Sequence, residues 1–367
     1  MTGPEHLEVG GARRRPSWWV LLVVVALFGG LLVVRLHSAQ DQAPDAVRPP
    51  GATAPPTAPP TPATTPWPAG RGLPSGTLYL VAGDEVYGID VAGGLVQPLG
   101  LHPVDPDQAL LTAMAPGVLV SSAEGRPRTR IWFPGGLLGQ TAGRVRSAES
   151  VLPASGGDVW TRTRQDWRPS VGATWVRAGD DGAPGPRLRV RGLAVPDGAG
   201  GLLDVDRSGV RVASPDADGE VVGTSLIGVG PDGLVVAACA AGSCTLELHD
   251  RASGRTTALG PSEAPSVDWV SAALDPEALS PGSRFLAASG SDQAGAFEVR
   301  ITGTTAPGVV RRTIPVGSRP ADLAWLSDRW LAVTSADGLL LYDADADAVV
   351  APSLPLQRPT QLVFDPA

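Results

Sequence analysis

The chain has 367 residues, with 29 basic and 37 acidic side chains, a formal net charge of −8 and 43% hydrophobic residues. This length allows one large domain or two small ones, and the acidic balance argues against a general affinity for nucleic acid. Neither Lys nor Asn occurs, so every basic residue counted is Arg, a bias typical of a GC-rich bacterial genome. Without Asn the chain has no N-glycosylation sequon.

The N-terminal region predicts where the protein is located. Residues 16–34 contain no charge, and a helix of that length spans about 30 Å, the thickness of a bilayer core. Tryptophans at the start of this stretch, and arginines just before it, favour an N-terminus inside the cell. We therefore predict a cytoplasmic tail over 1–15 and a transmembrane signal anchor over 16–36. The protein would be single-pass in the cytoplasmic membrane, with its C-terminal domain outside.

A cleaved signal peptide is the alternative for this stretch. Its apolar part is longer than the usual 7–15 residues of such a peptide. Small residues at the cleavage positions are also missing, because a cut after Ala39 would place His37 three positions before it. We therefore expect the segment to stay attached to the protein.

Residues 37–75 are rich in Pro and Thr. Such a composition cannot bury enough apolar surface to offset the entropy of ordering, and Pro keeps the chain extended. We predict a disordered, semi-rigid linker that holds the next domain away from the membrane.

Residues 76–367 have the pattern of an all-β domain. Gly and Pro recur every six to twelve residues between short runs rich in Val, Leu, Trp and Thr. A hairpin unit repeats, most clearly over 77–98, 233–259 and 330–352, with a mean spacing of about 42 residues, which is the period of propeller blades. The predicted fold is a seven-bladed β-propeller whose repeats place the ends of their second strands near Asp90, Pro134, Ala178, Ser214, Asp250, Gly303 and Asp343.

The last segment of the chain predicts how the ring closes. Residues 358–365, RPTQLVFD, repeat the pattern of residues 319–326, RPADLAWL, but no hairpin follows them. We expect this segment to be the innermost strand of the first blade, beside strands over 77–81, 85–91 and 95–99. Closure of this kind removes the open edge of the ring.

This repeat resembles the broad group of WD40/YVTN-like and TolB-like seven-bladed propellers. Residues 279–287, LSPGSRFLA, are similar to the TolB-type SPDG repeat, with Gly282 and Ser283 where Asp-Gly is usual. No Trp-Asp or Gly-His pair occurs, so a true WD40 repeat is not supported. The resemblance implies an architecture over about 290 residues and implies no functional residue.

Cys239 and Cys244 flank the turn of one predicted hairpin, in the part of the chain that we place outside the cell. Two cysteines in an oxidising compartment favour a structural disulfide. A reduced pair and a redox or metal-binding role are the alternatives.

Arginine is concentrated between residues 126 and 191, where twelve Arg and five acids give +7 and leave −15 for the rest of the chain. Several alternate along the sequence, which places them on one face of a strand. A basic sector of this kind could attract an anionic envelope polymer, phospholipid headgroups or an acidic protein. The alternative is a solvated strand face paired with local acids. The candidate binding surface comprises Arg126, Arg128, Arg130, Trp132, Arg162, Arg164, Trp167, Arg187, Arg189 and Arg191.

The sequence assigns no catalytic, cofactor or metal residue. Asp343, Asp345 and Asp347 resemble the start of a calcium loop, but Ala348 and Leu354 stand where an EF-hand needs Gly and Glu, so we expect a polar turn. The predicted outer domain has only two His residues, and it lacks a nucleophile elbow and a Ser-x-x-Lys motif.

The expected function is that of a non-catalytic binding or scaffolding module in the cell envelope. Its partners would be the cell membrane, through residues 16–36, and an envelope protein or anionic envelope polymer. A propeller hydrolase or lactonase with a metal in the central channel is the alternative. A third hypothesis is a sensor of the envelope that signals through its helix.

Overall fold

The computed structural model describes a large part of the chain beyond the predicted anchor. The predicted cytoplasmic tail and transmembrane segment, and residues 37–63 of the predicted linker, lie outside the described residues. Within the described part, no helix has the length and apolarity needed to cross a bilayer. The described residues are 64–103, 109–114, 118–123, 126–132, 145, 148–163, 167–168, 172–179, 184–216, 219–241, 243–262, 276–292, 294–317, 322–335, 337–356 and 358–366.

The predicted all-β class is confirmed, since the described elements are strands apart from a short 3-10 helix over Ser155–Gly157. The first two sheets along the chain are β29-β2-β3-β4 and β5-β6-β7. Their strands are β29 (Pro359–Pro366), β2 (Gly76–Ala82), β3 (Glu85–Asp90), β4 (Val96–Pro98), β5 (Ala109–Met114), β6 (Val118–Ala123) and β7 (Arg126–Trp132).

The next two sheets contain most of the arginine-rich region. In the third sheet β8, β9 and β11 are successive neighbours, and β10 and β12 both pair with β11. Its strands are β8 (Ser150–Pro153), β9 (Val159–Arg162), β10 (Trp167–Arg168), β11 (Gly172–Ala178) and β12 (Pro184–Val190). The fourth sheet contains β13 (Leu193–Pro196), β14 (Leu202–Asp206), β15 (Gly209–Val212) and β16 (Val221–Gly223).

An eight-stranded sheet follows, made of two four-stranded halves that are joined by parallel pairing of their first strands, β17 and β21. The first half contains β17 (Ser225–Val229), β18 (Gly233–Ala240), β19 (Ser243–Asp250) and β20 (Arg255–Ser262). The second half contains β21 (Glu277–Leu279), β22 (Phe285–Ser291), β23 (Phe297–Gly303) and β24 (Ala306–Gly317). The last sheet contains β25 (Leu323–Trp325), β26 (Trp330–Ser335), β27 (Gly338–Asp343) and β28 (Ala348–Pro352), with β1 (Thr64–Thr65) on its edge.

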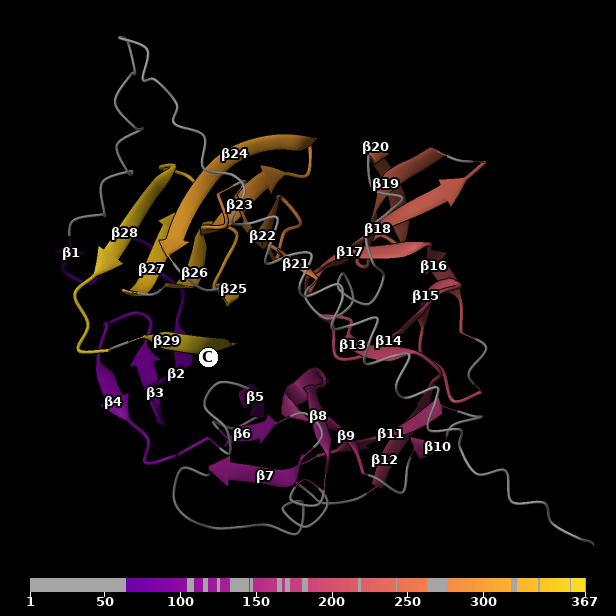
Figure 1. Cartoon of the computed structure of the whole chain (residues 1–367), viewed down its shortest axis with the longest axis horizontal. Helices are drawn as coiled ribbons and strands as arrows, with labels where there is room; N and C mark the ends of the chain where they lie inside the picture. The colour runs from indigo at the N-terminus through magenta and orange to yellow at the C-terminus, as the bar shows by residue number, and fades with distance from the viewer. Residues whose placement is uncertain are drawn as a thin grey trace, which may run out of the picture. The chain divides into compact units, whose positions relative to one another are not determined.

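Consecutive sheets lie beside one another in a propeller-like arrangement (Figure 1). The first strand of each sheet is usually the point of contact: β25 lies beside β29, β29 beside β5, β5 beside β8, and β8 beside β13. The fourth sheet meets the next one through β15 and β16, and β21 lies beside β25. Most neighbouring strands within a sheet are antiparallel and follow one another in the chain; the exceptions are the closing strand β29, strand β10, and the parallel pairs β1–β28 and β17–β21.

The predicted closure by the C-terminal segment is confirmed. β29 pairs along its length with β2, from Gly76 opposite Pro366 to Ala82 opposite Pro359. The carboxylate of Asp322, just before β25, accepts a hydrogen bond from the Leu362 amide at 2.8 Å and so links the last sheet to this closing strand. The core between these two sheets is apolar and fully buried at its centre, with Leu78, Leu80, Ile89, Trp330 and Leu341 among its members.

The strand ends predicted from the repeat agree well with the structure. Asp90, Ala178, Asp250, Gly303 and Asp343 are the last residues of β3, β11, β19, β23 and β27. Ser214 lies two residues beyond β15, and Pro134 lies outside the described residues. The hairpin repeat seen in the sequence therefore corresponds to a structural unit of the fold. Its turns could be located because Gly and Pro mark them.

Some residues predicted as linker contact the sheets. Thr64 and Thr65 form β1, which pairs in parallel with β28. The indole of Trp67 donates a hydrogen bond to the Val91 carbonyl at 3.0 Å, and Trp67 and Leu73 pack against the core of the first and last sheets. This end of the predicted linker packs against the sheets because the large ring of Trp67 gains more from burial than its proline-rich neighbours do.

Candidate functional site

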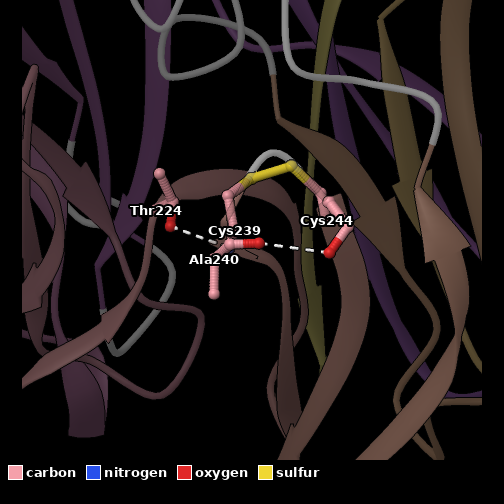
Figure 2. The surroundings of a disulfide bond; sticks show 5 residues. Thr224, Cys239, Ala240 and Cys244 are labelled. Carbon is pink, nitrogen blue, oxygen red and sulfur yellow. Dashed lines mark hydrogen bonds between the residues drawn. A yellow bond between two sulfur atoms is a disulfide. The ribbon is translucent and has the colours of Figure 1, made fainter.

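The predicted disulfide between Cys239 and Cys244 is confirmed. The two residues face each other on β18 and β19, and their sulfur atoms are bonded beside the turn of the hairpin (Figure 2). The Cys239 amide donates to the Thr224 hydroxyl at 3.0 Å, which ties this end of the hairpin to the chain before β17. The bond therefore stabilises a turn at the edge of the eight-stranded sheet.

The candidate arginine surface extends over four strands, β7, β9, β10 and β12, whose side chains are not all described. Arg126, Arg128, Arg130 and Trp132 belong to β7 and Trp167 belongs to β10, but only their backbone is described; Arg164 lies outside the described residues. Exposed members of this surface are Arg187 and Arg189 on β12, and Arg191 directly after that strand.

Strand register separates Arg162 from the arginines of β12. Arg162 lies opposite Ser150 on β8, and its guanidinium lies over the ring of Trp175 on β11, which is itself opposite Leu188. Arg187 instead lies opposite Val176, the next residue on β11. Because neighbouring residues of a strand point to opposite faces, Arg162 and Arg187 lie on opposite faces of the sheet. Alternation predicts a shared face for the arginines of β12, and Arg162 lies on the other face of the sheet.

Arg162 lines a cavity of about 420 Å³ between the third and fourth sheets. The walls come mainly from β8, β9, β11 and β13, and Val229 at the end of β17 and Pro276 just before β21 complete them. Three of these strands, β8, β13 and β17, are the first strands of their sheets. Most of the lining is apolar, with Val151, Leu152, Trp175, Leu193, Val195 and Val229 among its residues.

The Arg162 guanidinium is incompletely paired. Its Nη2 donates to the Ser150 hydroxyl at 3.0 Å, and its central carbon is 5.6 Å from the centre of the Trp175 ring. Its Nε is buried and has no hydrogen-bond partner. Among the described residues no carboxylate forms an ion pair with it, although burying a cation without a counter-ion is unfavourable.

Arg177, on the same sheet as Arg162, pairs with a nearby carboxylate. Its Nε donates to the Asp158 carboxylate at 2.6 Å and its Nη2 donates to the Ser155 carbonyl at 2.8 Å. A local acid therefore compensates this arginine, in agreement with the alternative considered for the basic sector. No carboxylate among the described residues pairs with Arg162 in this way.

Two acidic residues near the cavity, Asp204 and Asp197, have partners of their own. Asp204 accepts hydrogen bonds from the backbone amides of Arg191 and Gly192, at 3.0 and 2.8 Å. Asp197 lies 3.3 Å from the guanidinium of Arg251 and accepts the amide of Gly201 at 2.8 Å. The cavity therefore has a cation with an unused donor, which is suited to an anionic ligand.

The acidic run after β27 is a polar turn, as expected. Both Nε and Nη2 of Arg329 donate to the Asp343 carboxylate, at 2.8 and 2.6 Å, and the amides of Asp345 and Ala346 donate to the same group. The Arg329 hydrogen bonds hold the pKa of Asp343 below its usual value, although burial opposes this. Asp347 accepts the Tyr342 hydroxyl at 2.9 Å.

The two histidines of the domain are far apart in the chain: His102 follows β4, and His249 belongs to β19. His102 Nδ1 is 2.9 Å from the Asp84 carbonyl, and His249, near the end of β19, is 3.7 Å from the Glu247 carboxylate. Across the described ranges, no group of three His, Cys, Asp or Glu side chains is placed to hold a metal ion.

A second cavity contains an acid that no motif marks as functional. Glu277 is the first residue of β21 and is half-buried in a space of about 450 Å³ between the two halves of the eight-stranded sheet. Burial raises its pKa to about 7, and the charge of Arg300 opposes this rise. The only sequence signal is an acid at the start of an inner strand, where the repeat otherwise favours apolar residues.

Strand pairing and sheet order define an all-β, propeller-like protein. No family model matches the chain, and no curated protein matches it. Among solved structures, it is similar to a protein from Lactobacillus plantarum, with 14% identity, 79% of this chain and 99% of that chain covered, and a TM-score of 0.45.

Two further solved structures give similar values. A protein from Bacteroides fragilis that is provisionally assigned as a 6-phosphogluconolactonase has 14% identity, 81% and 99% coverage and a TM-score of 0.41. TolB from Acinetobacter baumannii has 12% identity, 81% and 68% coverage and a TM-score of 0.37. Such values say nothing of activity or ligand, and the fold assignment here depends on the strand pairing.

Proposed function

We propose that this chain is a membrane-anchored binding module of the cell envelope that holds an anionic group of its partner and does not catalyse a reaction. Its sheets would form seven blades, with each half of the eight-stranded sheet counted as one blade. The anchor is residues 16–36, and the partner is an envelope protein or an anionic envelope polymer.

The single observation that carries this proposal is Arg162. Its buried Nε has no hydrogen-bond partner among the described residues, its guanidinium lies over the ring of Trp175, and the surrounding cavity is mainly apolar. A carboxylate or phosphate oxygen that reached this donor would gain a charge-assisted hydrogen bond in a region of low dielectric constant.

The test is binding of polyanions to the full chain in lipid nanodiscs. Poly-L-glutamate supplies carboxylates and inorganic polyphosphate supplies phosphates, and both are measured at about 150 mM salt, where distant surface charges are screened. We expect Arg162→Met to weaken binding about tenfold, which corresponds to the loss of one charge-assisted hydrogen bond.

Arg187→Met is the matched control, because this variant also removes one arginine, but an exposed one that lies on the opposite face of the same sheet. It should change the affinity less than twofold. Equal losses in both variants would mean that only surface charge matters, and no binding of either polyanion would refute the proposal.

The location is tested separately. A fusion of alkaline phosphatase after residue 75 should be active, and the chain should stay in the membrane fraction after washing with carbonate. A mature protein that lacks residues 1–39 would instead support the cleaved signal peptide.

A further inference from the structure

The cavity around Glu277 lies at the only parallel strand junction between two sheet halves in the described part of the fold, where β17 meets β21. It receives residues from both halves and is about 450 Å³, which falls within the usual range for small-molecule sites. Its lining residues are Ile227, Leu246, Glu277, Leu286, Ala288, Ser289, Gly290, Arg300, Thr302 and Val310.

Two charged side chains, Glu277 and Arg300, line this cavity, and only Arg300 pairs with a side chain of opposite charge. Arg300 Nε donates to the Glu298 carboxylate at 2.8 Å and its Nη2 lies 3.3 Å from the Ser291 carbonyl. Glu277 forms no hydrogen bond or ion pair through its carboxylate with any described residue. The uncompensated charge in this cavity is therefore negative.

Among the described residues that line this cavity, Arg300 is the one other charged side chain. The lining residues from β17, β19 and β24 are apolar, and those from β22 are small or apolar. Strand β23 contributes Arg300 and Thr302, which has a hydroxyl group. Arg300 is thus the one charged neighbour, and it already pairs with Glu298. Burial without a partner is the physical reason why the pKa of Glu277 rises to about 7.

We propose that this cavity binds a small organic cation, a protonated amine with an apolar body, whose ammonium group pairs with the Glu277 carboxylate. The apolar body would contact Ile227, Leu286 and Val310, which line the same cavity. A metal ion is a poor fit, because it needs several oxygen ligands and the cavity has one carboxylate. This site is separate from the Arg162 cavity and does not depend on the proposed function.

The pairing makes the affinity depend on pH. An amine with a pKa near 10 stays protonated between pH 6 and 8, so Glu277 alone changes its charge. With a pKa of about 7, its ionised fraction rises from roughly one tenth at pH 6 to roughly nine tenths at pH 8. The amine should therefore bind about ninefold more tightly at pH 8 than at pH 6.

The experiment titrates cyclohexylamine into the full chain in lipid nanodiscs and measures heat at pH 6, 7 and 8. Cyclohexanol is the uncharged probe of similar shape. We expect the amine to bind with a roughly ninefold gain between pH 6 and 8, and cyclohexanol to show no such gain.

Glu277→Gln should abolish the pH dependence and lower the affinity for cyclohexylamine at pH 8 to that of cyclohexanol. Glu220→Gln, which removes an exposed carboxylate between β15 and β16, is the matched control and should bind as the native chain does. Circular dichroism checks that both variants are folded. The proposal is overturned by pH-independent binding in the native chain, by unchanged binding in Glu277→Gln, by equal binding of cyclohexanol at pH 8, or by no binding at all.

Discussion

The two cavities differ in the sign of their uncompensated charge. In the cavity between the third and fourth sheets the uncompensated group is Arg162, which lies over the Trp175 ring and donates a hydrogen bond to Ser150. In the cavity between the two halves of the eight-stranded sheet the uncompensated group is Glu277. It has no hydrogen-bond partner in the described structure, and its pKa is raised to about 7. A guanidinium keeps its charge at neutral pH, whereas a carboxyl group can lose its charge by protonation. The first cavity is thus permanently cationic, and the second changes its charge near neutral pH.

The largest expected effect concerns the wall of the first cavity. Trp175 is 4% exposed and belongs to the core between the third and fourth sheets. We expect Trp175→Ala to lower the free energy of unfolding by about 3–5 kcal/mol in urea titrations. Val310→Ala, in the wall of the second cavity where the side chain is 47% exposed, should change it by less than about 0.5 kcal/mol. Similar losses would mean that both cavities are equally well packed.

The next effect tests the charge of the second cavity. The pKa of Glu277 is raised from 4.5 to about 7 in the folded chain, so folding favours the protonated form. Its contribution is complete below pH 4.5 and is lost as the pH rises through 7, about 3 kcal/mol in all. Urea titrations at pH 5, 6, 7 and 8 should show this loss in the native chain and a much smaller one in Glu277→Gln. Parallel curves for the two proteins would contradict the raised pKa.

The disulfide is close in the chain to the second cavity, since β19 carries both Cys244 and the cavity residue Leu246. Closing so short a loop should stabilise the fold by about 2 kcal/mol. We expect the double variant Cys239→Ser, Cys244→Ser to lose that amount and to match the native chain under reducing conditions. Polyanion binding at Arg162 should not change, and a change there would show that the two regions are coupled.

The smallest effect compares two arginines of one sheet. Arg177→Met removes the pair with Asp158 and should lower the free energy of unfolding by up to about 1 kcal/mol. Arg162→Met removes a half-buried guanidinium that has no ion-pair partner among the described residues, so its stability should stay equal or rise by about 1 kcal/mol. Urea titrations side by side give the sign, and a loss in Arg162→Met would mean that a group outside the described residues compensates this arginine.

Much of the fold could be predicted from local sequence. Turns marked by Gly and Pro located the ends of β3, β11, β19, β23 and β27, and the repeated Arg-Pro pattern identified β29 as the closing strand. The disulfide followed from two cysteines beside one turn. These features depend on residues that are close in sequence or on a visible repeat.

The candidate sites could be predicted only in part, because they depend on packing between sheets. Alternation of Arg along the chain does not show that Arg162 faces the fourth sheet while Arg187 faces solvent. Glu277 becomes buried because β17 pairs with β21, although nearly fifty residues separate the two strands. The burial of a side chain between sheets depends on partners that are distant in sequence, so a local pattern does not reveal it.

Pairing of β29 with β2 also constrains how the domain is made. The first sheet draws its strands from both ends of the domain, so β2, β3 and β4 leave the ribosome long before their neighbour exists. Until then the inner edge of β2, which later pairs with β29, has free backbone donors and acceptors, the kind of edge on which chains aggregate. Translation must therefore reach β29 before this sheet can become complete, and a chain truncated before β29 would have an unfinished first sheet.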